Sequence, residues 1–399
     1  MATFFVLLIS TVAAFMLYIF FWDKWRNTLK PPIKETQLTP LSSYSPGYET
    51  VPTVFTGHRF PVECTALTDR YLVSACQEGR VYVWNIETGE RLGKINRLRM
   101  SSSPDGPPPP VPPQIWTLDA NSQICLIGCS DGSIEVGCLT RHKLIGVYQQ
   151  SKVGVVHIKI LDSTVILGRL DGSVDFIQLA LTEEKPLRVS SISPIKSIRA
   201  HSKPIAQMEI FDSVLISCSH DYTVKIFDTT SFEVVHTLLA HNAPVTAVCV
   251  DQSRKLLFSV CEEGVLCCWD LQTAELVRSI RTGYSSPILL ALCGVYVAVG
   301  SADNRIGLYD VANGQKEGDL SSNETAISRN RSLLAVNGEI IVSSLGHVVT
   351  FWDSREKAII RQVNMGLCID SLLRLSHNSV LCQCGNSLYK LNIPSRLSR

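Results

Sequence analysis

From Glu49 onward, short runs of alternating apolar and polar residues recur along the chain at a nearly constant spacing. Each unit holds an alternating run, a tight polar turn and a second alternating run. A period of two residues is typical of half-buried β-strands, and the Asp-Gly and Glu-Gly pairs favour hairpin turns. The turns with their second runs are QEGRVYVWN (77–85), SDGSIEVGC (130–138), LDGSVDFIQ (170–178), HDYTVKIFD (220–228), EEGVLCCWD (262–270), ADNRIGLYD (302–310), LGHVVTFWD (345–353) and CGNSLYKLN (384–392).

The spacing of these units, about 40 to 45 residues, is typical of four-stranded blades that carry a GH…WD signature. Gly57-His58, Ala200-His201 and Ala240-His241 open three of the units. We therefore predict an all-β fold, a WD-repeat β-propeller over 49–397, preceded by one N-terminal transmembrane α-helix. The eight units favour eight blades; seven blades, with one degenerate unit merged, is the alternative.

The last unit explains how the ring closes. It has three predicted strands, near 371–375, 380–383 and 388–393, and lacks an outer strand. The segment Glu49–Thr56 precedes the first Gly-His pair and can supply the missing strand. Such pairing would remove the open sheet edge that otherwise invites aggregation.

Two stretches interrupt the period, and we interpret both as insertions. The first, 96–113, follows blade one and contains PPPPVPP, which favours an extended polyproline helix. A solvated stiff loop is the favoured interpretation there, and docking into an aromatic groove is the alternative. The second insertion, 182–198, follows blade three.

The N-terminal part has a different pattern. No side chain from Met1 to Trp22 is charged, and the basic residues Lys24, Arg26, Lys30 and Lys34 follow. About 20 apolar residues can cross a bilayer as a helix, and the positive-inside rule then places the N-terminus in the lumen. We predict a transmembrane helix with its basic flank over 1–26 and a flexible linker over 27–48. A cleaved signal is less favoured, because the start is uncharged and bulky residues stand where cleavage would fall.

Composition narrows the function classes. The net charge of +1 provides no bulk attraction to nucleic acid, so no nucleic-acid partner is expected. The 14 cysteines show no zinc-ligand spacing, and many lie in apolar runs, as Cys125, Cys129, Cys267 and Cys268 do. We expect reduced, buried thiols in a reducing compartment, and no metal site or cofactor.

No phosphate-binding, metalloprotease, serine-hydrolase or kinase motif occurs, so we expect no enzyme and assign no catalytic residue. In WD repeats, a histidine at the start of a blade joins a strand serine, a turn aspartate and an aromatic residue in a hydrogen-bonded set. We expect structural roles of this kind, in polar sets or in packing, for His58, His201, His241, Asp221, Trp84, Trp269 and Trp352.

Several segments are more specific than the repeat spacing. They include YETVPTVFTGH (48–58), QIWTLDANSQICLIGCSDGSIEV (114–136), ILGRLDGSVDFIQL (166–179), AHSKPIAQMEIFDSVLISCSHDYTVKIF (200–227) and AHNAPVTAVCVDQSRKLLFSVCEEGVLCCWDLQTAELV (240–277). Through these segments the chain resembles the carboxy-terminal part of the SCAP family, the SREBP cleavage-activating proteins. The matching part of that family comprises the last transmembrane helix and the WD-repeat propeller.

The resemblance implies a membrane-anchored scaffold, or escort, that binds the C-terminal regulatory domain of SREBP. It implies ER-to-Golgi transport and proteolytic activation of SREBP in sterol homeostasis. The chain would reside in the endoplasmic reticulum membrane and cycle to the Golgi membrane in COPII vesicles, with a cytosolic propeller. A full-length form would also meet INSIG and the COPII coat. Only one hydrophobic run is present here, so we expect a form that lacks the sterol-sensing helices, which is a truncated gene product, a fragment or a short form that keeps only partner binding.

The resemblance also implies a basic partner-binding surface. Arg169 in GRLDGS and Lys203 in AHSKPI fall in matching segments, at turns on one rim. Arg59, Arg80 and Arg305 occupy comparable turns without a family motif. Ordinary solvated charges are the alternative for each of the five. The alternative for the whole chain is an ER-anchored WD-repeat adaptor of another complex, associated with a coat or a ubiquitin ligase.

Overall fold

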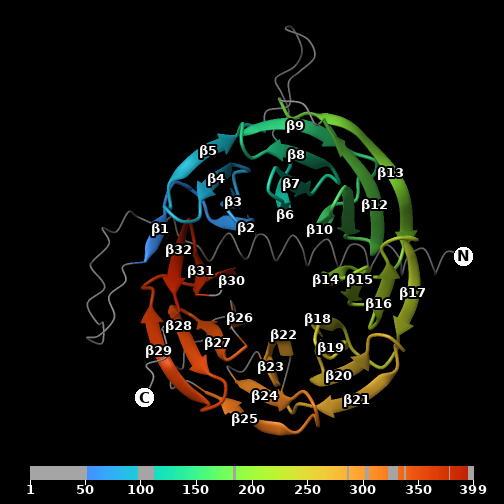
Figure 1. Cartoon of the computed structure of the whole chain (residues 1–399), viewed down its shortest axis with the longest axis vertical. Coiled ribbons are helices and arrows are strands. Elements are labelled where there is room, and N and C mark those ends of the chain that lie inside the picture. The colour runs from blue at the N-terminus through green and yellow to red at the C-terminus, as the bar shows by residue number, and fades with distance from the viewer. Residues whose placement is uncertain are drawn as a thin grey trace, which may run out of the picture. The chain divides into compact units, whose positions relative to one another are not determined.

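The chain divides into two compact units, Met1–Glu49 and Thr50–Arg399. A computed structural model describes residues 52–97, 112–182, 186–284, 287–301, 305–321, 331–336, 338–376 and 378–393, all within the second unit. These residues form eight four-stranded antiparallel sheets, arranged as blades around a ring (Figure 1). The eight-bladed propeller is confirmed, and the seven-bladed alternative is wrong.

In each blade the strands run from the centre of the ring outward. Blade one contains β2 (Val62–Leu67), β3 (Tyr71–Cys76), β4 (Val81–Asn85) and β5 (Arg91–Ile95). Blade two contains β6 (Ile115–Ala120), β7 (Ile124–Cys129), β8 (Ile134–Cys138) and β9 (Lys143–Tyr148). Blade three contains β10 (Val155–Leu161), β11 (Thr164–Arg169), β12 (Ser173–Leu181) and β13 (Val189–Arg199). Blade four contains β14 (Ile205–Phe211), β15 (Val214–Ser219), β16 (Val224–Asp228) and β17 (Glu233–Leu238).

The second half of the ring repeats this order. Blade five contains β18 (Val245–Asp251), β19 (Leu256–Cys261), β20 (Val265–Asp270) and β21 (Leu276–Arg281). Blade six contains β22 (Pro287–Cys293), β23 (Tyr296–Ser301), β24 (Ile306–Asp310) and β25 (Lys316–Leu320). Blade seven contains β26 (Arg331–Val336), β27 (Ile340–Leu345), β28 (Val348–Asp353) and β29 (Ala358–Asn364). Blade eight contains β30 (Ser371–Ser376), β31 (Ser379–Cys384), β32 (Ser387–Asn392) and, from the other end of the chain, β1 (Thr53–Phe55).

The ring closes as the sequence predicts. β1 pairs antiparallel with β32, with Val54 opposite Tyr389, and becomes the outer strand of the last blade. The Val62 amide donates to Gly385 O at 2.8 Å, which ties the first inner strand to the same blade. The Gln383 side chain donates to Val62 O at 2.7 Å. The first and last blades are therefore held together by backbone pairing and by these two further bonds.

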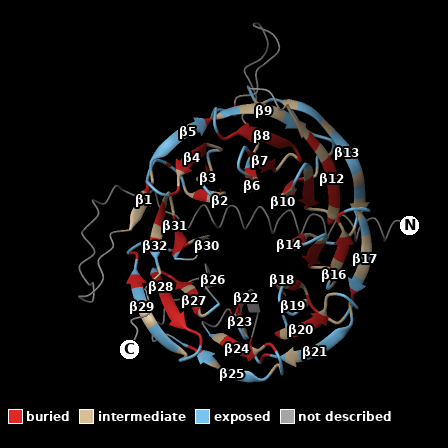
Figure 2. Cartoon of the chain, in the orientation of Figure 1, coloured by how far each residue is buried: buried red, intermediate tan, exposed pale blue. Residues whose placement is uncertain are grey.

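The apolar core lies between neighbouring blades. Buried side chains concentrate on the middle strands of each sheet, whereas the outer strands are largely exposed (Figure 2). One cluster joins Ile216 and Ile226 of blade four to Val248 and Trp269 of blade five. Another joins Phe55 in the last blade to the first blade. Each fully buried Val, Leu, Ile or Phe side chain contributes roughly 1.5–3 kcal/mol, so contacts between blades supply much of the stability.

The innermost strands have one edge without a strand partner, and side chains from the preceding blade satisfy some of its amides. Asp119 Oδ2 on β6 accepts the amide of Ile160 on β10 at 2.8 Å. Gln207 Oε1 on β14 accepts the amide of Val248 on β18 at 3.0 Å. These bonds fix the inner strands relative to one another, and they offset the cost of leaving buried backbone groups unpaired.

The predicted insertion at 182–198 is wrong as an insertion. Most of it is β13, the outer strand of blade three, which pairs with a lengthened β12. Its residues VSSISPIKSIR are mostly exposed, so the alternation that marks a half-buried strand is weak. An outer strand tolerates Pro194 because one of its edges has no strand partner.

Other predictions fall outside the described residues. These are the transmembrane helix and basic flank at 1–26, the linker at 27–48 and most of the insertion at 96–113. Within the described ranges, no helix combines the length and apolarity needed to span a membrane.

Removing the ring of Phe55 should strongly destabilise the propeller. This side chain is fully buried, with its ring centroid 5.9 Å from that of Trp84. We expect Phe55→Ala to lower the free energy of unfolding by about 3–5 kcal/mol. Denaturant unfolding of the detergent-solubilised chain measures this loss. Val235→Ala, at a side chain that is 51% exposed, is the control and should change the value by less than about 0.5 kcal/mol. Equal effects would contradict closure by β1.

Candidate functional site

One end of the propeller gathers the five predicted partner-binding residues, and we call it the turn face. Because the strands of a blade alternate in direction, two kinds of segment meet at this end. They are the turn between the second and third strands, and the loop from the outer strand to the next blade. Arg59 and Lys203 lie in such loops, Arg80 and Arg305 lie in such turns, and Arg169 ends β11 where a turn begins.

The five side chains differ in exposure. Arg59, Lys203 and Arg305 are exposed, and Arg80 is half-buried in an ion pair of 2.6 Å with Glu78. Lys203 Nζ lies 4.7 Å from the ring centroid of Tyr222, and the Arg305 guanidinium lies 5.0 Å from that of Tyr284. Such contacts hold a cation over an aromatic face.

Arg169 is buried and does not lie on the exposed surface, whereas the sequence placed it among the partner-binding residues of a basic rim. Its side chain is 2% exposed and is paired with Asp175 on β12. It also donates to Val153 O at 2.7 Å and to Gly132 O at 3.3 Å. The carboxylate and the two carbonyl oxygens accept hydrogen bonds from Nε and Nη1 of the buried guanidinium, so this residue ties blade three to the loop and turn of blade two.

A second buried ion pair, Arg97–Glu135, was missed at the sequence level. Arg97 Nε lies 2.6 Å from Glu135 Oε2, and Nη2 lies 3.2 Å from Oε1, which is a bidentate arrangement. Arg97 also donates to Gly79 O, so it joins blade one to blade two. The sequence did contain one indication of a buried ion pair, namely the carboxylate of Glu135 inside the otherwise apolar run SIEVGC.

Blades one and five carry the histidine, serine and tryptophan sets typical of WD repeats. His58 Nε2 lies 2.7 Å from Ser74 Oγ, to which Trp84 Nε1 donates at 2.7 Å. His241 Nε2 lies 2.7 Å from Ser259 Oγ, and Trp269 Nε1 donates to the same oxygen at 2.9 Å. In blade seven, Trp352 Nε1 donates to Ser343 Oγ at 2.8 Å.

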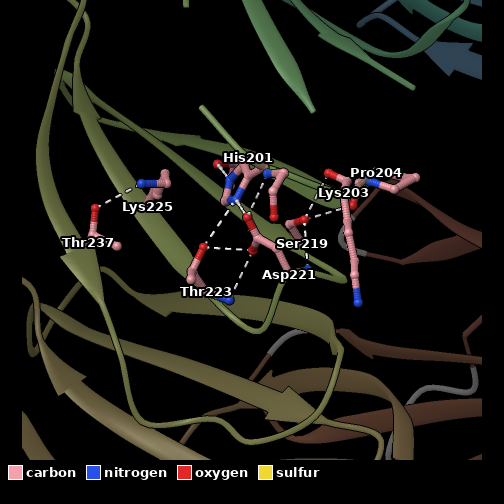
Figure 3. Close-up of polar contacts among 10 residues, drawn as sticks. His201, Lys203, Pro204, Ser219, Asp221, Thr223, Lys225 and Thr237 are labelled. Carbon is pink, nitrogen blue, oxygen red and sulfur yellow. Dashed lines mark hydrogen bonds and ion pairs between the residues drawn. The ribbon is translucent and has the colours of Figure 1, made fainter. Parts of the chain in front are cut away.

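Blade four has the most extended set (Figure 3). His201 Nε2 lies 2.7 Å from Ser217 Oγ, and Nδ1 lies 3.0 Å from Asp221 Oδ2. Asp221 also accepts the amides of Ser202 and Thr223 at 3.0 and 3.1 Å. The carboxylate therefore faces the loop and turn of its own blade, and its hydrogen-bonding capacity is used there.

The histidines in these sets are poor proton carriers near neutral pH. Burial lowers the pKa of His58 to about 4, and the charges of Arg80 and Arg91 act in the same direction. Burial lowers the pKa of His241 to about 4. Burial also lowers the pKa of His201, although Asp221 opposes the shift. Neutral, immobilised imidazoles with serine partners suit a structural role better than general acid–base chemistry.

Metal-ligating and thiol side chains are further candidates for chemistry among the described residues. No group of three or more His, Cys, Asp or Glu side chains among them could hold a metal ion. Each of the 14 cysteines is a free thiol. Burial raises the pKa of Cys125 to about 12 and that of Cys129 to about 11, so little of the nucleophilic thiolate forms at neutral pH.

Comparison with known proteins agrees with this geometry. The WD domain, G-beta repeat family matches residues 49–85, 192–228 and 232–270, which cover parts of blades one, three, four and five and the closing strand β1 of blade eight. The described residues form a WD-repeat propeller. A sterol regulatory element-binding protein cleavage-activating protein from Xenopus laevis is 25% identical over 313 residues, which are 71% of this chain and 24% of that protein.

Other relatives show the breadth of the fold. Telomerase protein component 1 of Rattus norvegicus is 22% identical over 74% of this chain and 11% of its own length. The present chain thus spans a quarter or less of these two relatives. Among solved structures, Saccharomyces cerevisiae Sqt1 has a TM-score of 0.68 at 13% identity, covering 86% of this chain and 98% of Sqt1. BamB from Moraxella catarrhalis has a TM-score of 0.66 at 14% identity, covering 88% of this chain and 100% of BamB.

The buried histidines should make the propeller less stable in acid. The ordinary histidine pKa of 6.5 applies to the unfolded chain, whereas His58 and His241 titrate at about 4 when folded. The unfolded chain therefore binds these protons first, so stability is full above about pH 6.5 and falls as the pH drops toward 4. Urea unfolding between pH 7 and 4.5 should show a shallower pH dependence in His58→Gln/His241→Gln than in the parent. An unchanged slope would contradict burial of neutral histidines.

Removing the Arg169 side chain should damage folding and not merely alter the surface. Arg169→Ala leaves Asp175 buried without its cation, so we expect a loss of about 3–5 kcal/mol in the free energy of unfolding. Lys203→Ala, which removes an exposed cation, is the matched control and should cost less than about 0.5 kcal/mol. Denaturant unfolding compares the two variants, and similar values would show that Arg169 is not held in a buried pair.

Proposed function

We propose that this chain is a membrane-anchored WD-repeat scaffold that binds the C-terminal regulatory domain of SREBP. The observation that carries the proposal is the similarity over 313 residues to a protein whose name describes activation of SREBP cleavage. WD propellers act as scaffolds for other proteins, and the described residues form such a propeller. The proposed role is to hold SREBP for transport from the endoplasmic reticulum to the Golgi and for its proteolytic activation.

Exposed cations on the turn face are the proposed contacts. Arg59, Lys203 and Arg305 are exposed, and two of them are held over aromatic rings. Arg80 is a weaker candidate because Glu78 already pairs with it. Arg169 is no longer proposed as a contact, because its side chain is buried and paired with Asp175. The proposed basic surface therefore consists of three side chains, from blades one, four and six.

The proposed location is the endoplasmic reticulum membrane, with residues 1–26 as the anchor and the propeller in the cytosol. The 14 free thiols support a reducing compartment. INSIG and the COPII coat are proposed partners only of a longer form that includes the sterol-sensing helices.

Binding of the SREBP C-terminal domain tests the proposal directly. The detergent-solubilised chain should retain this domain on an affinity resin, and Lys203→Glu/Arg305→Glu should weaken the retention. Raised salt should also weaken it, because exposed charge pairs are screened beyond about 8–10 Å at physiological ionic strength. Lys94→Glu, a charge reversal on the exposed outer strand β5, is the control and should behave as the parent.

The outcomes separate two functions. If the parent chain does not retain the domain, the proposed function fails. The chain is then better assigned as an ER-anchored adaptor of a coat or ubiquitin-ligase complex. If the domain binds and both charge reversals behave alike, the partner uses a surface other than these cations.

A further inference from the structure

Tyr222 has a backbone conformation that bulky residues rarely adopt. Its φ angle is +75°, in the turn between β15 and β16. The matching position in blades one, two, three and five is glycine, and the φ angles of Gly79, Gly132, Gly172 and Gly264 lie between +77° and +87°. Each of these five residues donates its amide to the carbonyl three residues earlier, so the turns are equivalent. Blade four thus places a tyrosine where its neighbours use glycine.

The side chain of Tyr222 also occupies space that is closed in the other blades. A Cβ atom at Gly132, Gly172 or Gly264 would collide with backbone oxygens of the following loop, among them those of Ser151, His201 and Tyr284. In those blades the loop covers the turn. The ring of Tyr222 is instead accommodated and remains 39% exposed, so the turn face of blade four has a different surface.

Two further side chains complete this surface. Lys203 Nζ lies 4.7 Å from the Tyr222 ring centroid, and the Lys203 side chain extends away from the polar contacts of Asp221 (Figure 3). Leu239 is 73% exposed, the highest value for a large apolar side chain among the described residues. The β16–β17 pairing ends with Val224 opposite Leu238, so the next step in register places Leu239 beside the turn that holds Tyr222. We call Lys203, Tyr222 and Leu239 the blade-four corner.

The outward charge of the blade-four corner is positive. Asp221 is committed to His201, Ser202 and Thr223, and no carboxylate pairs with Lys203 among the described residues. Exposed Glu262 and Glu263 occupy the corresponding turn of blade five. The positive corner is therefore small and bounded by acidic residues on the next blade. It suits a few carboxylates better than the extended phosphate backbone of a nucleic acid.

We propose that the blade-four corner docks an acidic segment of a protein partner. A carboxylate of that segment pairs with Lys203, and a neighbouring apolar side chain packs on Tyr222 and Leu239. A backbone outlier at an exposed aromatic residue is expected where binding, and not folding, requires that residue. Exposed aromatic anchors beside a cation are typical of interface hot spots. This inference rests on the proposed function only in assigning a protein partner to the turn face.

A defined peptide tests the proposal. The probe is a fluorescein-labelled peptide of alternating Glu and Leu, measured by anisotropy against the detergent-solubilised full chain. Peptides with Lys in place of Glu, or Ser in place of Leu, are the comparison. We expect the Glu-Leu peptide to bind and neither comparison peptide to do so. Tyr222→Gly and Lys203→Glu should each weaken that binding about tenfold or more, which corresponds to about 1.4 kcal/mol. Lys94→Glu is the matched charge control and should leave binding unchanged.

Thermal unfolding of Tyr222→Gly separates a binding role from a folding role. Because glycine relieves the left-handed conformation, the midpoint should equal or exceed that of the parent. A lower midpoint would show that the tyrosine serves folding and would overturn the inference. If Tyr222→Gly does not fold, Tyr222→Asn replaces it, because asparagine also tolerates a positive φ angle.

Peptide binding and retention of the SREBP domain together decide between this inference and the proposed function. Failure of the parent to bind the Glu-Leu peptide, or equal binding by Lys203→Glu, would overturn the inference. If the peptide binds as expected while the SREBP domain is not retained, the proposed function fails and the acidic-segment site stands. If the domain is retained by Tyr222→Gly as well as by the parent, that domain docks elsewhere.

Discussion

The structure depends on the burial of apolar side chains between neighbouring blades. A four-stranded sheet has two faces, and a single blade cannot bury either of them alone. Here each side of the contact comes from a different blade, as where Ile226 of blade four meets Trp269 of blade five. The burial of every sheet is therefore complete only in a closed ring. The outer strands pack least and carry most of the exposed residues, and this leaves the turn face and the outer edges free to vary.

Polar contacts then fix how adjacent blades meet at the turn face. In blades one, four and five, a histidine from the preceding loop reaches a strand serine. At the junctions of blades one and two and of blades two and three, buried arginines do comparable work by reaching carbonyl oxygens of the neighbouring blade. The histidine and arginine contacts differ in their electrostatics. The neutral imidazoles carry no buried charge, whereas the buried guanidinium groups of Arg97 and Arg169 require the carboxylates of Glu135 and Asp175 as counter-charges. The histidine–serine contact is therefore present in blades one, four and five, whereas Arg97 and Arg169 act at the two junctions of blade two.

Much of the fold could be predicted because it rests on local patterns. Eight short turns, each followed by an apolar strand-like run, recur along the chain, so the eight units and the closing segment could be predicted. The strands after these turns are more deeply buried than a half-buried alternation predicts, since all five residues of β8 are buried. β13 was not predicted, because an exposed outer strand rich in Ser and containing Pro194 has no buried face to create alternation. Arg169 was misplaced for a related reason: the sequence shows that a residue ends a strand, but not that its side chain turns inward to Asp175. The left-handed Tyr222 could have been suspected, since HDYT places a tyrosine where the turns of blades one, two, three and five have glycine.

Pairing of β1 with β32 also dictates an order of events during synthesis. Val54 emerges from the ribosome among the first propeller residues, but its partner Tyr389 emerges among the last. The closing strand β1 therefore stays unpaired while all eight inner strands are synthesised. Its contact with β32 has nearly the longest sequence separation within the propeller. Until then the blades made first can pack against one another only as an open arc with two unprotected ends. The nascent propeller is consequently most vulnerable to non-native strand pairing just before β32 appears, and a variant without β32 would remain open.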